Sequence, residues 1–273
     1  MGPDLTISLL DRDALAAAAE DGLFLMPAVP GLIELVDMPG VRGRIAADAS
    51  PSANTVGSDG TRADRATLMT LVDRFRQERK GCCWWRGGPR EAPSGPELSA
   101  AGFTLSEHIV VALAVDDLSL PIPLEPDVTV REAYPGDYDL VLSLFMDGFS
   151  TALDFSRVFV DSLLLTEYPC RFYIASIGRT PAAMAFATYF DDRPVVSLSG
   201  AATLPAFRGR GLYRALVSRR MRDAAADGKT AAVIQARTTS APILRRVGFS
   251  ELFAFERYVL AAPEVSGAAT SSA

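Results

Sequence analysis

The stretch ATLPAFRGRGLYRAL, running from Ala202 to Leu216, joins an apolar, β-prone run to an amphipathic helix through a short loop of two glycines and two arginines. After the loop, Leu212, Ala215 and Met221 recur at helical spacing. Glycines at the head of a helix allow backbone N–H groups to converge on an anion, and the helix dipole adds positive potential there. The stretch therefore predicts a strand, a loop and a helix that together bind a pyrophosphate.

Arginines gather in and after this loop and give a chain of net charge −6 a local basic surface. They are Arg208, Arg210, Arg214, Arg219, Arg220 and Arg222. Guanidinium groups pair well with phosphates, so this surface suits a ligand with several phosphates, such as coenzyme A. For Arg219, Arg220 and Arg222 we favour the alternative that they solvate the outer face of the helix. The loop is not a P-loop, because Lys and Ser/Thr do not follow its glycines, and it lacks the third glycine of a dinucleotide fingerprint.

Composition limits the other classes of function. The chain has 273 residues, of which 49% are hydrophobic, enough for one large domain or two smaller ones. The net charge gives no case for a nucleic-acid partner or an anionic membrane. The three cysteines make neither a disulfide framework nor a metal spacing, and the single histidine, His108, is interpreted as a strand residue. We expect a cytoplasmic protein without a metal, because no targeting signal or membrane-spanning run is found.

A proline-rich connector, LSLPIPLEPD at 118–127, separates two halves of the chain. The second half is predicted to contain a strand at 127–134, helices at 135–149 and 156–168, strands at 171–177, 182–190 and 195–204, the glycine loop with its helix, a strand at 230–236, a short helix at 241–248 and a last strand at 251–261. The predicted domains are 1–120 and 128–262, with a linker at 121–127 and a disordered tail at 263–273.

This order of elements, together with the run Arg208, Gly209, Arg210, Gly211, Leu212 and Tyr213, resembles the GCN5-related N-acetyltransferase family over about 128–262. The family signature is Arg or Gln, two residues, Gly, one residue, then Gly or Ala, and the last position departs from it here. TLP at 203–205 and QARTTSAPILRRVGF at 235–249 are also similar to the segments that flank the signature in the family.

The resemblance implies a mixed-sheet α/β fold and a division of labour around the loop. Ala202, Thr203 and Leu204 would hold the pantetheine arm on a strand that splays from its neighbour, while residues 208–213 would hold the pyrophosphate. The implied reaction is direct attack of a neutral amine on the acyl carbon of acyl-CoA. The family usually places a tyrosine acid four residues before the Gly-Phe that follows its last helix. Here that position is Leu244, so the catalytic residues stay unknown.

The first half repeats the order helix, strand, short helix, Gly-Phe and strand, which indicates an internal duplication. Leu98 corresponds to Leu244, and Gly102 corresponds to Gly248. The loop that precedes the first copy, SPSANTVGSDGTRAD at 50–64, has no Arg-Gly-Arg-Gly. The N-terminal half is therefore predicted to be a degenerate acyltransferase-like domain whose role is packing or shaping the substrate cleft. Of its adjacent tryptophans, Trp84 and Trp85, only one can face the core.

The sequence thus predicts a tandem acyltransferase-like enzyme that transfers an acyl group, with acetyl expected, to a small-molecule amine. Two alternatives stay open: a CoA-binding pseudoenzyme, and another thioester reaction such as decarboxylation or hydrolysis on the same scaffold. The identity of the amine and the oligomeric state are not specified by the sequence.

Overall fold

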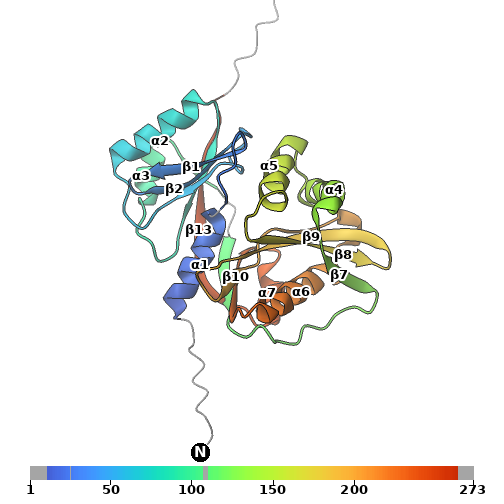
Figure 1. Cartoon of the computed structure of the whole chain (residues 1–273). Coiled ribbons are helices and arrows are strands. Elements are labelled where there is room, and N and C mark those ends of the chain that lie inside the picture. Colours follow the sequence, from blue (N-terminus) through green and yellow to red (C-terminus); the bar gives the residue numbers. More distant parts are fainter. Residues whose placement is uncertain (1–10, 25, 107–109, 264–273) are drawn as a thin grey trace, which may run out of the picture.

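The computed structural model describes residues 11–24, 26–106 and 110–263, so His108 and nearly all of the predicted tail lie outside the described residues. Within these ranges, two halves share one mixed sheet of thirteen strands (Figure 1). No helix in the described ranges is long and apolar enough to cross a membrane. The same ranges hold no group of three or more His, Cys, Asp or Glu residues placed to bind a metal ion.

The N-terminal half begins with a helix that packs on the shared sheet, followed by a small strand and helix unit. Its elements are α1 (Arg12–Phe24), β1 (Ile33–Met38), β2 (Val41–Ala46), β3 (Thr55–Gly57), α2 (Arg65–Gln77), β4 (Cys82–Arg86), α3 (Gly95–Ala100), β5 (Thr104–Leu105) and β6 (Val110–Val115). Side chains start both later helices: Asp64 Oδ1 accepts a hydrogen bond from Thr67 N at 2.8 Å, and Ser94 forms a capping box with Glu97.

The C-terminal half follows the predicted order closely. Its elements are β7 (Val128–Glu132), a short 3₁₀ turn (Pro135–Asp137), α4 (Tyr138–Phe149), α5 (Leu153–Leu164), β8 (Cys170–Ile177), β9 (Thr180–Tyr189), β10 (Val195–Ser197), β11 (Ala201–Thr203), a second 3₁₀ turn (Pro205–Phe207), α6 (Leu212–Ala226), β12 (Ala231–Arg237), α7 (Ala241–Arg246) and β13 (Ser250–Leu260).

The single strand predicted at 195–204 is wrong in one respect, because the structure divides it into β10 and β11. On β9, Thr188 pairs with Ser197 and Ala185 pairs with Ala201. Three residues, 198–200, therefore lie opposite two on β9, which is a bulge. A bulge depends on strand pairing in space, which residue alternation does not reveal.

The last strand of each half lies in the sheet of the other half. The strand order is β1-β2-β3-β4-β13-β6-β12-β10-β9-β8-β7. Strand β6 pairs antiparallel with β12, while β13 pairs with β6 over its first part and with β4 from Glu256 to Leu260. The two halves therefore share strands and do not close separate sheets. The domain boundaries at 120 and 128 stay a prediction, since the exchange crosses them.

Both halves repeat one local topology. Strands β3 and β4 are parallel and enclose α2 in the chain, as β10 and β12 are parallel and enclose α6. A short helix then follows in each half and ends two residues before a glycine, Gly102 or Gly248. The next residues, Phe103 and Phe249, are both buried. This matches the order of elements predicted from the internal duplication.

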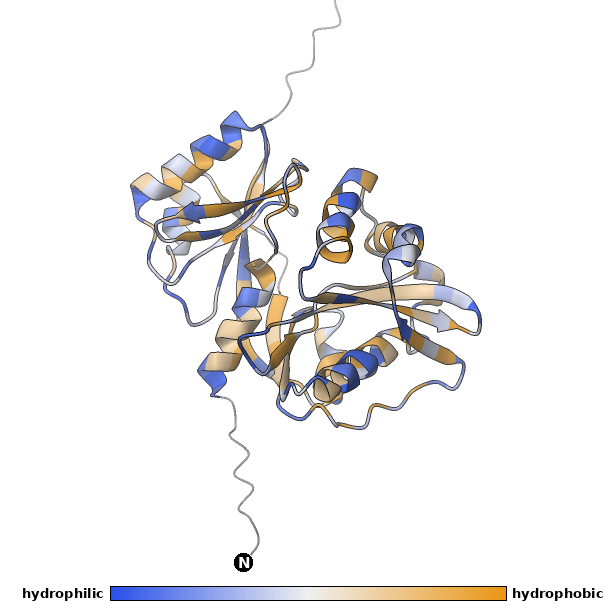
Figure 2. Cartoon of the chain, viewed as in Figure 1, coloured by the Kyte–Doolittle hydropathy of each residue, from blue (hydrophilic) through white to orange (hydrophobic). Residues whose placement is uncertain are grey.

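Helices cover both faces of the C-terminal sheet (Figure 1). One face packs on α6 and α7 through a core that includes Leu216, Met221 and Leu244. The opposite face packs on α4 and α5 around Phe145 and Met184, and on α1 through alanines and Val233. Strands at the centre are coloured mainly as hydrophobic in Figure 2, in keeping with a sheet buried on both faces.

The two tryptophans divide as the strand geometry requires. Trp84 is fully buried in the N-terminal core, edge-to-face with Phe103. Trp85 points to the other face, where it is half-buried and meets Phe255 edge-to-face. Each tryptophan therefore has a packing role, as the sequence favoured.

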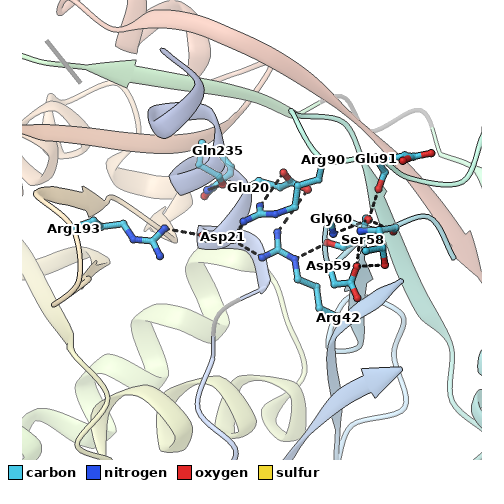
Figure 3. Close-up of polar contacts among 12 residues, drawn as sticks. Glu20, Asp21, Arg42, Ser58, Asp59, Gly60, Arg90, Glu91, Arg193 and Gln235 are labelled. Atoms are coloured by element: carbon cyan, nitrogen blue, oxygen red, sulfur yellow. Dashed lines mark hydrogen bonds and ion pairs between the residues drawn. The ribbon is translucent and has the colours of Figure 1, made fainter. Parts of the chain in front are cut away.

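An ion cluster joins α1 to both halves, and Figure 3 shows its side chains converging on Glu20 and Asp21. Asp21 pairs with Arg42 of β2, with Arg90 at 2.8 Å and with Arg193 at 2.7 Å. Burial alone would raise the pKa of Asp21, but hydrogen bonds from Arg42 and Arg193 outweigh it and hold the pKa below its ordinary value. We call these residues the α1 ion cluster.

Candidate functional site

The glycine loop ends in a helix terminus whose N–H groups have no partner. Gly209 and Gly211 have φ of 78° and 80°, a left-handed conformation that L side chains rarely adopt. Gly211 is the N-cap of α6, and the first helical bond runs from Ala215 N to Gly211 O. Among the described residues, nothing accepts a hydrogen bond from the N–H groups of 209–214. These donors are therefore free to bind an anion, and the assignment of residues 208–213 to the pyrophosphate stays a prediction.

The matching helix of the first half has no such vacancy. Its N-cap is Asp64, whose carboxylate accepts the Thr67 N–H, and Asp59 accepts the N–H groups of Thr61 and Gly40 at 2.7 and 3.0 Å. The Asp64 carboxylate thus occupies one of the helix donors that a phosphate would use, and the Asp59 carboxylate occupies a donor of the preceding loop. The charge of this loop opposes an anionic ligand, in contrast to the loop before α6.

The predicted phosphate arginines lie at the mouth of the loop, and each has an internal contact. Arg208 Nε donates to Thr203 O at 3.2 Å, Arg210 pairs with Asp127 at 3.5 Å, and Arg214 Nη2 donates to Glu125 Oε1 at 2.9 Å. Arg208 is exposed, and the side chains of Arg210 and Arg214 are 48% and 36% exposed. They can therefore turn toward a phosphate at modest cost, since exposed ion pairs contribute little.

The carboxylates opposite these arginines come from the connector, which sequence reasoning treated only as a linker. Leu118 and Ile122 bury their side chains in the core beside α6 and α7. This anchoring carries Glu125 over the head of α6, where a Cβ added to Gly211 would lie 2.7 Å from Glu125 Cγ. The alternating acidic residues after the prolines of the connector are visible in the sequence, but the sequence does not show which residues they contact.

Strand β11 presents one open edge. Phe186 N donates to Gly200 O at 3.1 Å, and Leu204 N donates to Ala182 O at 2.9 Å, so alternate residues of this segment face β9. The backbone groups of Ala201 and Thr203 consequently point away from β9. On that side β12 pairs with β10 only as far as Val233, so β11 and β12 diverge. The gap is the splayed edge that the resemblance implied.

The predicted pantetheine residues differ in what they offer. Thr203 lies on the open edge, whereas the Leu204 N–H is already bonded to β9. The Ala202 side chain is buried against α4, where a Cβ added to Gly148 would lie 2.6 Å from Ala202 Cβ. Ala201, which the sequence did not select, shares the open edge with Thr203. The assignment of Ala202, Thr203 and Leu204 to pantetheine stays a prediction.

The last two loop residues turn their side chains inward. Leu212 is buried in the core under α6, so only its backbone can meet a ligand. Tyr213 packs against the same core. Burial raises the pKa of the Tyr213 phenol, against the opposing effects of the Arg220 cation and the Ser240 hydroxyl. Tyr213 therefore stays protonated near neutral pH.

Leu244 is a core residue and has no exposed surface. It packs under α7 with Ala241 and Phe249, in the cluster that also holds Leu216. No proton donor can act from that side chain, so the structure leaves the leaving-group acid unassigned. The hydroxyls of Ser197 and Ser199, 3.1 Å apart, are polar groups at the start of the bulge, and neither is a base at neutral pH.

Residues 138–249 match the profile of the Acetyltransferase (GNAT) family. A GCN5-related N-acetyltransferase from Kribbella flavida has a similar fold, with a TM-score of 0.64, 17% identity, and coverage of 94% of this chain and 98% of that one. A tandem GNAT protein from the clavulanic acid biosynthesis pathway matches with a TM-score of 0.58 and 16% identity over 94% of both chains. A GCN5-related N-acetyltransferase from Sphaerobacter thermophilus matches with a TM-score of 0.56 and 13% identity over 85% of both. A search of curated proteins gave no match.

Proposed function

We propose that this chain, which carries an acetyltransferase domain of the GNAT family at 138–249, transfers an acetyl group from acetyl-CoA to a small-molecule amine. The observation that carries the CoA part is the set of unpartnered N–H groups at 209–214, next to the open edge of β11. Convergent N–H groups at a helix start favour a pyrophosphate. Ala201 and Thr203 would pair with the amide groups of the pantetheine arm.

The main contribution of the protein to this reaction is to position the thioester and the amine. Backbone donors hold the CoA moiety and so fix the thioester relative to an incoming amine. The amine must attack as the neutral base, and the CoA thiolate is a fair leaving group because a thiol pKa is about 8.5. Turnover therefore does not require a tyrosine at position 244, although an acid typically contributes about 10²- to 10⁴-fold.

The N-terminal half supports a small acceptor. Its Ile33 and Ala46 pack against Val158 of α5, and the Arg44 guanidinium lies 5.4 Å from the Phe159 ring centroid. These contacts cover one side of α5. We therefore propose that the N-terminal half, which we interpret as a degenerate copy, forms a wall of the acceptor cleft.

Charge supports an amine as the acceptor. A hollow of about 450 Å³ lies between α5 and the loop after β2, and three aspartates and one arginine line it: Asp48, Asp154, Asp161 and Arg157. An excess of carboxylates raises the local concentration of cations. A protonated amine would therefore gather in this hollow.

The test is release of free CoA thiol from acetyl-CoA with a panel of small amines, followed by mass spectrometry of the acetylated product. We expect amine-dependent release, with a KM for the amine that rises with salt because screening weakens the attraction. Release without any amine would indicate thioester hydrolysis instead. No release with any amine, despite measurable CoA binding, would contradict transfer and favour a CoA-binding protein without turnover.

A further inference from the structure

Arg220 is buried, although the sequence favoured an exposed position for it. Its neighbours on α6 behave as predicted or nearly so, since Arg222 is exposed and half-buried Arg219 pairs with Asp223 at 2.9 Å. Arg220 has no exposed surface and points from α6 into the sheet. A buried cation is rare unless something in the structure requires it.

The guanidinium of Arg220 is inserted at the bulge between β10 and β11. Nη1 donates to Phe186 O at 2.9 Å and to Ser199 O at 3.1 Å, while Nε donates to Leu216 O at 3.1 Å. The two Nη1 bonds connect β9, which carries Phe186, to the bulge residue Ser199. Arg220 thereby supplies donors where the register between β9 and β10 is interrupted.

A glycine in the bulge, Gly200, also helps to fix the bulge geometry. Gly200 has φ of 38°, and a Cβ there would overlap the Phe186 ring. A glycine is thus required directly after Ser199. Because Ala201 follows at once, the angle at which the open edge of β11 leaves the sheet is set at this point.

No carboxylate in the described part of the chain pairs with Arg220, and its Nη2 has no hydrogen-bond partner there. Burial lowers the pKa of the guanidinium, and the phenols of Tyr213, Tyr173 and Tyr189 act in the opposite direction. A purely structural cross-link between carbonyls would not need a charged group with an unused donor. The cost of burying it points to a role in the site.

We infer that Arg220 is a positioning residue of the acyl-CoA site: it holds the carbonyls of Phe186 and Ser199 and thereby fixes the direction of the β11 edge that receives pantetheine. This inference rests on the proposed function. Arg220 acts on the pantetheine and acyl end of the ligand and not on the phosphates, because its three bonds are all to the bulge and to its own helix, while the phosphate donors are the N–H groups of 209–214.

Two ligands can distinguish an effect on the pantetheine end of the site from an effect on its phosphate end. Adenosine 3′,5′-bisphosphate carries phosphates but no pantetheine, whereas CoA carries both. We expect Arg220→Met to bind CoA about 10- to 100-fold more weakly, the range for losing a charge-assisted hydrogen bond, and to bind the bisphosphate within about twofold of wild type. Arg222→Met, an exposed change of the same charge on the same helix, should leave both affinities unchanged. Calorimetry on the full chain measures each affinity.

A second variant covers the case in which Arg220→Met does not fold. Arg220→Lys keeps a cation and can reach one carbonyl, so it should retain part of the CoA affinity, and hydrogen exchange should speed up at the amides of 199–203 before those of β8 or α4. The inference is overturned if a folded Arg220 variant binds CoA as wild type does, or loses both ligands equally. A wild-type chain that binds neither ligand would contradict the proposed function itself.

Discussion

Replacing Gly211 by aspartate should convert the head of α6 into the state that the head of α2 already has. In the first half, Asp64 is the N-cap at φ −79° and its carboxylate accepts the Thr67 N–H of the first turn. In the second half, Gly211 is the N-cap at φ 80° and the donors are free. Gly211→Asp places a fixed negative charge where we propose that the pyrophosphate binds.

The substitution has two costs, of which the first falls on folding and the second on CoA binding. An L residue held in the left-handed conformation costs about 1–2 kcal/mol, or the backbone rotates and the new carboxylate caps the helix as Asp64 does. The second cost is repulsion: two unit charges about 4 Å apart at an effective dielectric constant of 20 interact by about 4 kcal/mol. Solvent and salt reduce that figure, so we expect a loss of about 3 kcal/mol, or at least a hundredfold in CoA affinity.

Calorimetric titration with CoA measures this loss, with circular dichroism as the check on folding. The matched control is Asp64→Gly, which should leave CoA affinity unchanged and cost only a few tenths of a kcal/mol of stability. Gly57→Asp is unsuitable as a control, because Gly57 lies under the ring of Phe24 and a larger side chain would unfold this region. A folded Gly211→Asp protein that binds CoA as wild type does would refute the assignment of the phosphate site.

Four further outcomes are expected. Arg208→Ala should raise the KM for acetyl-CoA by about 10-fold or more and should lower kcat less than that. Arg65→Ala at the start of α2 should change neither constant. An effect of Arg208→Ala on kcat alone would place Arg208 in the chemical step. Leu244→Ala should lower the free energy of unfolding by about 2–5 kcal/mol, because it empties a fully buried position, and should leave kcat per folded molecule within a few-fold; a much larger loss of turnover would show that this side chain shapes the site. Asp21→Asn should lower the free energy of unfolding by about 3 kcal/mol at pH 7 in denaturant titrations. Because the pKa of Asp21 is depressed in the folded protein, the difference between variant and wild type should shrink as the pH falls below about 4. A pH-independent difference would mean that the charge of Asp21 is not what stabilises the fold. Glu125→Gln should strengthen CoA binding up to about fivefold at low salt and less at high salt, because the carboxylate competes for a phosphate arginine; weaker binding would mean that Glu125 orients that arginine for the ligand.

Local patterns predicted most of the elements and the glycine loop that precedes α6. The glycines and the helical spacing after them are local features, which a sequence displays directly. Gly209 and Gly211 have the left-handed backbone that their identity suggested. The match at 138–249 confirms the family that the resemblance named.

Contacts between distant segments could not be predicted in the same way. Arginine is usually exposed, so nothing in the run Arg219, Arg220, Met221, Arg222 marks the second as buried; only the carbonyls at the bulge, contributed by β9 and the segment after β10, select it. The approach of Glu125 to the head of α6 likewise depends on how Ile122 anchors the connector. Alternation predicts that a segment is a strand, but not which strand it pairs with.

The shared strand β13 has a consequence for how the protein is made. Strand β4 pairs with residues that lie far later in the chain, as in the ion pair from Arg86 to Glu256 across 170 positions. While the ribosome is still synthesising α6 and β12, the edge of β4 that will pair with β13 has no partner strand. The first half therefore exposes an unpaired apolar strand until β13 is made. Contacts of such long sequence separation slow folding, so the nascent chain needs protection from aggregation until its final strand emerges. Separately expressed halves would each lack a strand and would have to exchange strands to complete either sheet.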